Sequence, residues 1–550
     1  MNNGFINVRR LREGPWQGFE RLIARFLEHG GFSEVALVGG SGDLGADIVG
    51  IMGGKRWVIQ SKFRSTSNTG ETAVVEAFDA HWSYDADVIV AATNRQFTSD
   101  ALFYQKQKLT EGFDVRLWEN NFFLEQFRLL PEYSKSKKNL REYQKEAIEA
   151  LHHAELLGCN KALITLATGL GKTLVSSTFV SEYLEKYSQA NILVLAHMTD
   201  LVRQLERACW AQFSKYTDTH VWTDGEVPIY VNGVTFATWQ SVLLSFRSGE
   251  PIEGKYDLII VDECHHAASL GYRELLECLK PKFLVGVTAT PWRGDGESLR
   301  PIFGDPVFTM DIVQGMQQGF LADVDYTMLL DGIDWEEIRS LSHQGLSVKD
   351  LNKRLYVPER DLGMVETICD TIKLTGEART LVFCRSIAHA ERLQLFFRQF
   401  DVSAGVLHSE MHRSDRFKTL TEFRKGGIKI LISIEMLNEG IDVPEVNIVV
   451  FARVTHSRRI FLQQLGRGLR ISPLKKNVKV LDFVADIRRI AAGVDINTTA
   501  ESYKTQEEVR YPSGEIVKFT RYSQDFFQEY LADMADISDL DDDAHLDFPP

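Results

Sequence analysis

The feature that most constrains the fold of this chain is a series of short, uninterrupted apolar runs that repeats between about residue 160 and residue 485. Polar segments with helical character separate these runs. The eight runs are KALITLA (161–167), NILVLA (191–196), YDLIIV (256–261), FLVGV (283–287), TLVFC (380–384), KILIS (429–433), VNIVVF (446–451) and VKVLDF (478–483). Runs of this length are typical of strands buried on both faces of a sheet, with helices between consecutive strands. We therefore expect α/β structure built on parallel sheets.

A gap in this series divides it into two sets of runs. Residues 331–372 are polar, prone to form helices and without a strand signal, so they are expected to connect two α/β domains. The basic, polar stretch YSKSKKNL (133–140) indicates a linker before the first of them. The expected organisation is an N-terminal α/β domain at 1–130, a linker at 131–138, α/β domains at 139–330 and 373–490, a helical connector at 331–372, and a C-terminal extension at 491–550.

The N-terminal segment has its own pattern of elements. Apolar residues recur at helical spacing in GFERLIARFLEHGGF (18–32), which ends at Gly30-Gly31, a pair that stops a helix. Strands are expected at VALVG (35–39), ADIVGI (46–51) and WVIQSKF (57–63). The pair Gly53-Gly54 favours a tight turn between the last two strands. These elements predict a separate α/β domain.

The charge of the chain is unevenly distributed. The 550 residues are 44% hydrophobic and 25% charged, which excludes a mainly disordered or fibrous protein. The formal net charge of −14 argues against a protein that coats nucleic acid by bulk charge. Residues 522–550 carry nine acids and no Lys or Arg, so most of the excess lies in one acidic tail, which we expect to be disordered. This tail is either a solubilising end or a mimic of DNA that shields a cleft.

Two observations concern the compartment. No run approaches the roughly 18 apolar residues that a membrane span needs, and the basic start of the chain lacks the apolar core of a secretory signal. The six cysteines are far apart and form no CxxC pair, which excludes an obvious zinc site and is typical of free thiols in a reducing compartment. We therefore expect a cytoplasmic protein without a membrane span.

The segment ATGLGKT (167–173) directly follows a predicted strand and precedes a predicted helix, as a phosphate-binding loop does. Its glycines allow backbone amides to face phosphate, Lys172 would reach the β- and γ-phosphates of ATP, and the Thr173 hydroxyl would hold Mg²⁺. Leu166 stands where the usual first glycine would be, so a Gly-rich helix start is the alternative reading. The residues of this loop expected to bind ATP are Thr168, Gly169, Gly171, Lys172 and Thr173.

A second motif supports this reading. LIIVDECHH (258–266) places Asp262 and Glu263 at the carboxyl end of a predicted strand. Asp262 is expected to hold Mg²⁺ from the side opposite Thr173, and Glu263 to orient and deprotonate the attacking water. Such a pair is also found as an ordinary cap of a strand. The tetrapeptide Asp-Glu-Cys-His behind a phosphate-binding loop favours an ATPase instead.

In this order the motifs resemble those of superfamily 2 helicases of the DEAD/DEAH-like group, close to the helicase parts of type I and type III restriction enzymes, over about residues 139–485. The resemblance implies two RecA-like lobes that bind ATP and nucleic acid. LREYQ (140–144) resembles the adenine-reading segment, which implies that Arg141 and Gln144 contact the base. LAHMTDLVRQ (195–204) and TWQS (238–241) resemble segments that contact a nucleic-acid strand.

The remaining motifs follow in the family's order. TATPWRGD (288–295) resembles motif III, which implies that Thr288 and Thr290, with His265, couple the ATP site to the nucleic-acid site. FCRS (383–386) and LHSEM (407–411) resemble nucleic-acid-binding turns. LNEGIDVP (437–444) resembles motif V, and FLQQLGRGLR (461–470) resembles motif VI. In motif VI two arginines three residues apart share a helix face, and they would neutralise phosphate charge when the lobes close. The residues that these two motifs imply at the ATP site are Gly440, Asp442, Gln463, Arg467 and Arg470.

A second candidate site lies in the N-terminal domain. Asp47 begins one predicted strand, and Gln60 and Lys62 lie two apart on the next, so the latter share a face. Across a tight hairpin Asp47 would approach both of them. A carboxylate and a neighbouring oxygen would hold Mg²⁺, while the lysine would position water and stabilise the charge of a phosphodiester under attack. Glu20, on the preceding helix, would supply a second carboxylate.

The string around these residues resembles the Mrr branch of the PD-(D/E)XK restriction nucleases over about residues 18–128. The resemblance places Glu20, Asp47, Gln60 and Lys62 on the active-site pattern, with Asp47 and Gln60 as metal ligands for Mg²⁺ or Mn²⁺. VIVAATNRQFTSDA (88–101) resembles a later strand and turn of that family. Gln60 stands where the wider fold has an acid, and a neutral ligand binds Mg²⁺ less tightly. A domain that binds DNA without cutting it is therefore the alternative.

Together these resemblances imply an ATP-dependent restriction-type enzyme, in which a metal-dependent endonuclease is fused to a helicase or translocase that acts on duplex DNA. A role in defence against foreign DNA, other restriction or defence subunits and a homodimer follow as expectations from the family alone. The alternative is a DNA-remodelling helicase whose N-terminal domain recognises modified DNA without cutting it. An RNA helicase is a third reading, because the helicase motifs alone do not name the nucleic acid.

Overall fold

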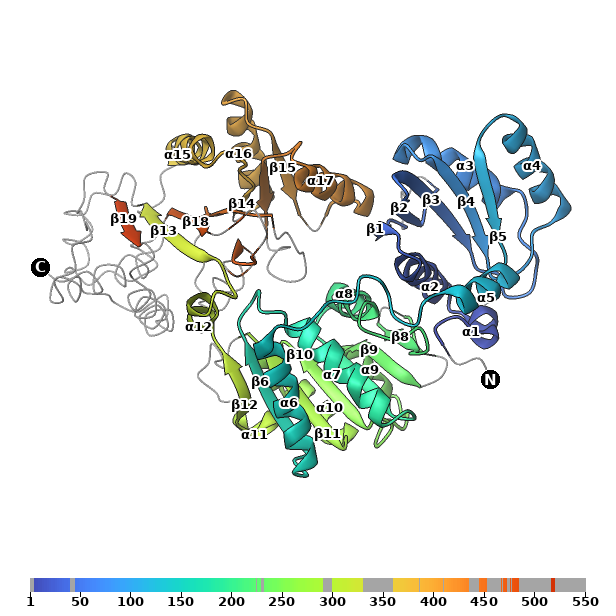
Figure 1. Cartoon of the computed structure of the whole chain (residues 1–550), viewed down its shortest axis with the longest axis horizontal. Helices are drawn as coiled ribbons and strands as arrows, with labels where there is room; N and C mark the ends of the chain where they lie inside the picture. Colours follow the sequence, from blue (N-terminus) through green and yellow to red (C-terminus); the bar gives the residue numbers. More distant parts are fainter. Residues whose placement is uncertain are drawn as a thin grey trace, which may run out of the picture.

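The structure is a computed structural model, and it describes residues 4–39, 45–223, 225–228, 232–289, 299–329, 360–384, 386–408, 410–434, 445–452, 466, 468–471, 475, 477–483 and 516–519. Within these ranges the strands form three sheets, which follow one another along the chain (Figure 1). The first has five strands, and the second and third have seven each. The expected fold class, a restriction-endonuclease-like α/β domain before two RecA-like α/β domains, is confirmed. The acidic tail at 522–550 lies outside the described residues.

The N-terminal sheet is mixed and has the strand order β1-β2-β3-β4-β5. The strands β1 to β3 are antiparallel, and β3 to β5 are parallel. Its strands are β1 (Ser33–Leu37), β2 (Ile48–Met52), β3 (Lys55–Lys62), β4 (Val88–Thr93) and β5 (Asp114–Trp118). Its helices are α1 (Val8–Glu13), α2 (Trp16–His29), α3 (Thr72–Tyr84), α4 (Ser99–Thr110) and α5 (Asn120–Leu129). The expected helix near the N-terminus, the three expected strands and the turn at Gly53-Gly54 are all present.

Two apolar layers cover this sheet, and β3 contributes to both. Trp57 and Ile59 belong to the cluster under α2 and α5, whereas Val58 belongs to the cluster under α3 and α4. Successive side chains of a strand point to opposite faces. Gln60 and Lys62 therefore share the α3 face with Val58, and Ser61 lies on the α2 face.

The second sheet is wholly parallel, in the order β12-β6-β11-β10-β7-β9-β8, and it forms lobe 1. Its strands are β6 (Lys161–Leu166), β7 (Asn191–Ala196), β8 (Thr219–Trp222), β9 (Gly233–Thr238), β10 (Leu258–Asp262), β11 (Phe283–Thr288) and β12 (Pro306–Met310). Its helices are α6 (Glu142–Leu156), α7 (Lys172–Lys186), α8 (Thr199–Trp210), α9 (Trp239–Arg247), the 3₁₀ helix η1 (Cys264–Ala268), α10 (Leu270–Leu279), α11 (Arg300–Phe303) and α12 (Ile312–Gln317). The four apolar runs predicted here are β6, β7, β10 and β11, and they lie next to one another in the sheet.

The third sheet, of lobe 2, has the order β15-β16-β14-β17-β18-β13-β19 and is parallel except for β19. Its strands are β13 (Asp323–Leu329), β14 (Thr380–Phe383), β15 (Ala404–Leu407), β16 (Ile430–Ser433), β17 (Ile448–Phe451), β18 (Asn477–Phe483) and β19 (Ile516–Phe519). Its helices are α15 (Arg360–Thr375), α16 (Ile387–Gln399) and α17 (Arg413–Lys425). Strand β13 lies in the range expected for the first domain, yet it pairs with β18 along its whole length. The chain therefore enters the sheet of lobe 2 before residue 330.

Among the described residues, no helix combines the length and the apolar character that crossing a bilayer would require.

Candidate nucleotide and nuclease sites

The phosphate-binding loop joins the buried strand β6 to helix α7. Gly169 and Gly171 have φ angles of 94° and 86°, a backbone region that suits glycine. A Cβ on Gly171 would lie 2.7 Å from Nε2 of Gln144. Helix α7 begins at Lys172, so its first amides and the positive end of its dipole face the space above the loop. The predicted loop thus has the backbone geometry that a phosphate-binding loop needs.

Two side chains of α6 hold this loop from behind. Gln144 Nε2 and the Tyr143 hydroxyl donate to the Leu170 carbonyl, at 2.8 and 2.7 Å. The side-chain Oε1 of Gln144 accepts from the backbone amide of Arg141 at 2.9 Å. The Arg141 guanidinium donates to the backbone carbonyl of Phe320 at 2.9 Å. Both α6 side chains are buried, and burial raises the pKa of Tyr143. The buried amide of Gln144 thus supports the loop, while contact of Arg141 and Gln144 with adenine stays a prediction.

The carboxylates of the Asp-Glu pair lie at the end of β10, in the middle of the sheet. Lys172 Nζ lies 3.0 Å from Glu263 Oε1, so the loop lysine and the expected water-activating acid form an ion pair. Glu263 has a φ angle of 45°, a left-handed conformation that is costly for a residue with a side chain and is concentrated at functional sites. Burial, with Glu263 and Asp262 nearby, raises the pKa of the Cys264 thiol well above its ordinary value. Cys264 is therefore an uncharged thiol and no nucleophile.

A buried chain of polar contacts leaves this site toward the next strand. His265 Nδ1 lies 3.5 Å from Glu263 Oε2 and 3.0 Å from the Thr288 hydroxyl. Both His265 and Thr288 are buried. The structure therefore brings together two of the three expected coupling residues, and Thr290 lies outside the described residues.

Replacing Thr288 by valine is expected to lower the DNA-stimulated ATPase rate about tenfold while the affinity for ATP is kept. The substitution keeps the shape and removes a hydrogen bond worth about 1–1.5 kcal/mol, which corresponds to roughly tenfold in rate. The measurement is steady-state ATPase with and without duplex DNA. The control is Thr235→Val, a buried threonine of β9 in the same sheet. Equal DNA stimulation in the Thr288 variant and the wild type would contradict the coupling role.

Lobe 2 reaches the phosphate-binding loop through the described part of motif VI. A Cβ on Gly466 would lie 2.5 Å from Cβ of Thr168, and a Cβ on Gly169 would lie 3.6 Å from Cγ of Arg470. Ala322 donates its amide to the Leu469 carbonyl at 2.8 Å. Of the residues expected from lobe 2, Arg470 is therefore beside the loop. Gly440, Asp442, Gln463 and Arg467 lie outside the described residues.

Two expected strand-contacting segments of lobe 1 lie side by side. Gln240 of the second segment donates through Nε2 to the carbonyl of His197 in the first, at 3.3 Å. The ring of His197 lies 4.0 Å from that of His266, and Trp239 stacks on Tyr272 at 5.1 Å. The two segments lie at the carboxyl ends of the parallel strands β7 and β9. Asp262 lies at the same end of the neighbouring strand β10.

The N-terminal site is built around a buried carboxylate. Asp47 lies directly before β2, and its Oδ2 accepts from the amide and the hydroxyl of Ser61, at 2.7 and 2.9 Å. Gln60 is buried, and within the described residues its Oε1 has no hydrogen-bond partner. Lys62 Nζ forms an ion pair with Glu76 of α3 at 2.5 Å. Asp47 therefore contacts the residue between Gln60 and Lys62.

Ser61 and Glu76 were not among the predicted residues. Ser61 lies between Gln60 and Lys62, and only its proximity to Asp47 reveals its role. Glu76 comes from a helix that covers β3, a placement that no local pattern indicates. Glu20 lies on α2, on the other layer of the domain.

The donor set fits a hard divalent cation. A carboxylate and an amide oxygen are ligands that Mg²⁺ and Mn²⁺ accept, and the unpartnered Oε1 of Gln60 is an available donor. Within the described part of the chain, no three His, Cys, Asp or Glu side chains gather closely enough to form a metal site of their own. Asp47 and Gln60 would therefore hold a metal together with oxygens of the bound nucleic acid and water.

Three family models match the chain in succession. The model described as "Restriction endonuclease" matches residues 11–126. The model described as "Type III restriction enzyme, res subunit" matches residues 137–293, and "Helicase conserved C-terminal domain" matches residues 363–472. The first match covers all five strands of the N-terminal sheet, the second covers β6 to β11 of lobe 1, and the third covers β14 to β17 of lobe 2.

Several named proteins resemble about two thirds of the chain. The type I restriction enzyme EcoAI endonuclease subunit of Escherichia coli is 26% identical over 61% of this chain and 45% of its own length. The EcoKI endonuclease subunit of Escherichia coli K12 is 26% identical over 68% of this chain and 36% of its own length. The DNA 3'-5' translocase XPB2 of Sulfurisphaera tokodaii is 25% identical over 61% of this chain and 80% of its own length. The chain spans 57% and 59% of two yeast relatives, little more than half their length.

One solved structure resembles nearly the whole chain. The ATP-dependent Type ISP restriction-modification enzyme LlaBIII bound to DNA matches 97% of this chain and 42% of its own, with a TM-score of 0.53 and 17% identity. The likeness at this identity is one of fold.

Proposed function

Because this chain joins a superfamily 2 helicase to an N-terminal Mrr-type restriction endonuclease domain, we propose that it is an ATP-dependent DNA translocase or helicase that also cuts DNA. The observation that carries the proposal is the presence of two separate polar centres in one chain. One is the pair of Lys172 with Glu263 beneath α7, and the other is Asp47 with Gln60 and Lys62. The first suits phosphoanhydride hydrolysis and the second suits phosphodiester hydrolysis.

In lobe 1 the amides at the start of α7 and Lys172 would bind the phosphates of ATP. Binding would draw Lys172 away from Glu263, which frees that carboxylate to accept a proton from the attacking water. Thr173 and Asp262 would hold Mg²⁺, which neutralises the charge that develops on the phosphates. Arg470, already beside Gly169, would add charge from lobe 2 when the lobes close.

In the N-terminal domain, Lys62 would stabilise the pentavalent phosphorus and orient water for attack. Asp47 and Gln60 would hold Mg²⁺ or Mn²⁺, which lowers the pKa of bound water. Ser61 orients the Asp47 carboxylate through two hydrogen bonds, and Glu76 fixes the Lys62 ammonium. We further propose duplex DNA as substrate, a cytoplasmic setting and a role in defence against foreign DNA, with restriction subunits or a second copy as partners.

The test is cleavage of methylated and unmethylated supercoiled plasmid with Mg²⁺ or Mn²⁺, with and without ATP. We expect nicked or linear product and an ATPase rate that DNA stimulates more than RNA does. Stimulation by RNA alone would contradict DNA as the substrate.

A second function is favoured by one observation. Gln60 is neutral where a carboxylate would bind metal more tightly, which suits a domain that recognises modified DNA and delivers the helicase to it. DNA-stimulated ATPase with no cleavage under either metal would support this second function and contradict the first.

A further inference from the structure

The N-terminal domain and lobe 1 share a buried junction. Trp210, the last residue of α8 in lobe 1, packs into the apolar cluster of the N-terminal domain and is 2% exposed. Lys215 of lobe 1 is also buried, and its Nζ donates to the carbonyls of Phe127, Arg128 and Leu130 at the end of α5. A cation at this end of a helix complements the helix dipole. The two domains therefore interlock through apolar and charged contacts.

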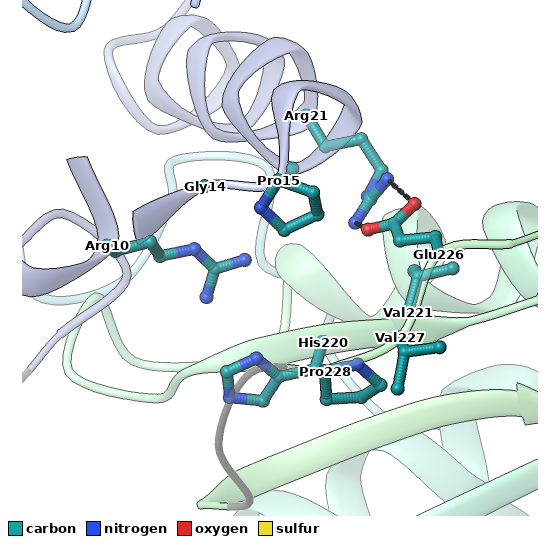
Figure 2. A pocket seen from close by; sticks show the side chains of 10 residues that line it. Arg10, Gly14, Pro15, Arg21, His220, Val221, Glu226, Val227 and Pro228 are labelled. Carbon is teal, nitrogen blue, oxygen red and sulfur yellow. Dashed lines mark hydrogen bonds and ion pairs between the residues drawn. The ribbon is translucent and has the colours of Figure 1, made fainter. Parts of the chain in front are cut away.

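Arg21 of α2 lies in this junction, and Figure 2 shows its guanidinium against the Glu226 carboxylate of lobe 1. Its Nε lies 2.8 Å from Glu206 on α8, and its two terminal nitrogens bind both oxygens of Glu226. All three side chains are buried, at 5%, 1% and 4% exposure. A fully buried charge requires paired partners of good geometry, so these contacts fix the position of the guanidinium closely.

Two other arginines of the N-terminal domain, Arg25 and Arg10, also contact lobe 1. Arg25, one turn further along α2, donates to the carbonyls of Thr217 and Ser214 at 2.9 and 3.1 Å. Arg10 pairs with Asp218 at 3.0 Å. Arg21 and Arg25 thus hold one face of α2 against lobe 1.

The opposite side of α2 belongs to the N-terminal domain. Phe19, Ile23 and Phe26 pack into the apolar cluster under the sheet. The α2 helix also packs against β3, the strand that carries Lys62. On the lobe 1 side, α8 begins at Thr199, within the strand-contacting segment that contains His197. This segment is therefore joined to Arg21 through α8 and Glu206.

We propose that Arg21 is a positioning residue that fixes helix α2 on lobe 1, so that the N-terminal sheet, with Asp47 and Lys62, is carried with lobe 1 while lobe 2 moves. This rests on the proposed function in so far as Asp47 and Lys62 belong to the nuclease site. Cleavage would then occur at a fixed place relative to the strand-contacting segments of lobe 1.

The first test neutralises the whole group in the full chain. The variant Arg21→Met/Glu206→Gln/Glu226→Gln removes all three charges together, so none of the three is left buried without its partner. We expect its DNA-stimulated ATPase to stay within about twofold of the wild type, and its cleavage rate to fall about tenfold or more, with a higher Mg²⁺ concentration needed for half-maximal cleavage. The control is Arg247→Met/Glu274→Gln, which removes an exposed ion pair of lobe 1 remote from the junction.

The metal titration separates positioning from mere folding. A change in thermal stability alone would lower the amount of active protein and leave the Mg²⁺ midpoint unchanged. Arg21→Lys keeps the charge and is expected to restore part of the cleavage rate. Wild-type cleavage and an unchanged Mg²⁺ midpoint in the triple variant would overturn the proposal.

The second test needs no cleavage. One fluorophore is placed on the exposed native Cys159 of lobe 1, and the other on Lys106→Cys in α4 or on Arg398→Cys in α16, with the half-buried Cys278 replaced by serine. We expect the 106–159 distance to stay constant when DNA and a non-hydrolysable ATP analogue are added, while the 159–398 distance changes. In the triple variant the 106–159 distance distribution should broaden.

The outcomes distinguish the two proposals. If the wild type does not cut DNA, the nuclease function fails, and the distance measurement still decides whether lobe 1 carries the N-terminal domain. A 106–159 distance that changes with nucleotide as much as the 159–398 distance would overturn the inference even if cleavage is observed.

Discussion

Replacing Lys172 by alanine is expected to reduce ATP hydrolysis by about 10²–10³-fold, the effect of removing a preorganised charge from a transition state. The lysine begins α7, lies 3.0 Å from Glu263, and is the cation that the loop directs at the phosphates. Its loss also leaves Glu263 without its partner in the free protein. The measurement is steady-state ATPase with saturating DNA, together with direct binding of a fluorescent ATP analogue.

The matched control for this prediction is Lys145→Ala. Lys145 lies on α6 of the same lobe and forms an exposed pair with Glu142 at 3.0 Å, so only a surface charge is lost. The control should hydrolyse ATP at the wild-type rate, since exposed pairs of this kind contribute little. A Lys172 variant that hydrolyses ATP within threefold of the control would show that the loop is not the catalytic site.

Replacing Lys62 by alanine is expected to abolish DNA cleavage, with a fall of about 10²–10³-fold, while ATPase activity is kept. Lys62 ends β3 on the face it shares with Gln60, and Glu76 holds its ammonium at 2.5 Å. The substitution removes the cation that would stabilise charge on the phosphodiester, and it leaves Asp47 and its bonds to Ser61 in place. Plasmid nicking and ATPase rates are measured on the same preparation.

Lys55→Ala is the matched control for the nuclease prediction, because Lys55 begins the same strand and is exposed at its far end. It should cut DNA at the wild-type rate. If the Lys62 variant also nicks DNA at that rate, the assigned nuclease site is wrong. If neither the wild type nor either variant cuts DNA, the recognition function is favoured.

The sequence predicted the central strands of both lobes because each is apolar on both faces and therefore stands out as a continuous run. Strand β8 is short and carries Thr219 and His220, so it forms no such run. Strand β13 contains Asp323 and Asp325, and it belongs to the sheet of lobe 2 because it pairs with β18, whose residues lie 154 positions further along the chain. Pairing over such distances leaves no local signal.

The residues of the candidate sites also divide into those that a local motif marks and those that only contacts distant in the sequence bring into place. Lys172, Glu263, Asp47 and Lys62 could be read from motifs because each lies at or near the end of a predicted strand, and the strand end fixes its place. Glu76 and Arg21 could not, because their partners are on other elements and, for Arg21, on another domain. Contacts between domains depend on the assembled surface and leave no local periodicity.

The placement of Trp210 has a consequence for how such proteins are assembled in evolution. Because a residue of lobe 1 completes the apolar core of the N-terminal domain, and Lys215 binds the end of one of its helices, residues 1–130 alone lack part of their own interior. An N-terminal domain of this kind could not be exchanged between helicase parts as a self-sufficient module. A transferred unit with a complete interior would have to include α8, with Glu206 and Trp210, and the following Lys215. The boundary of such a unit lies inside lobe 1 and not at the linker.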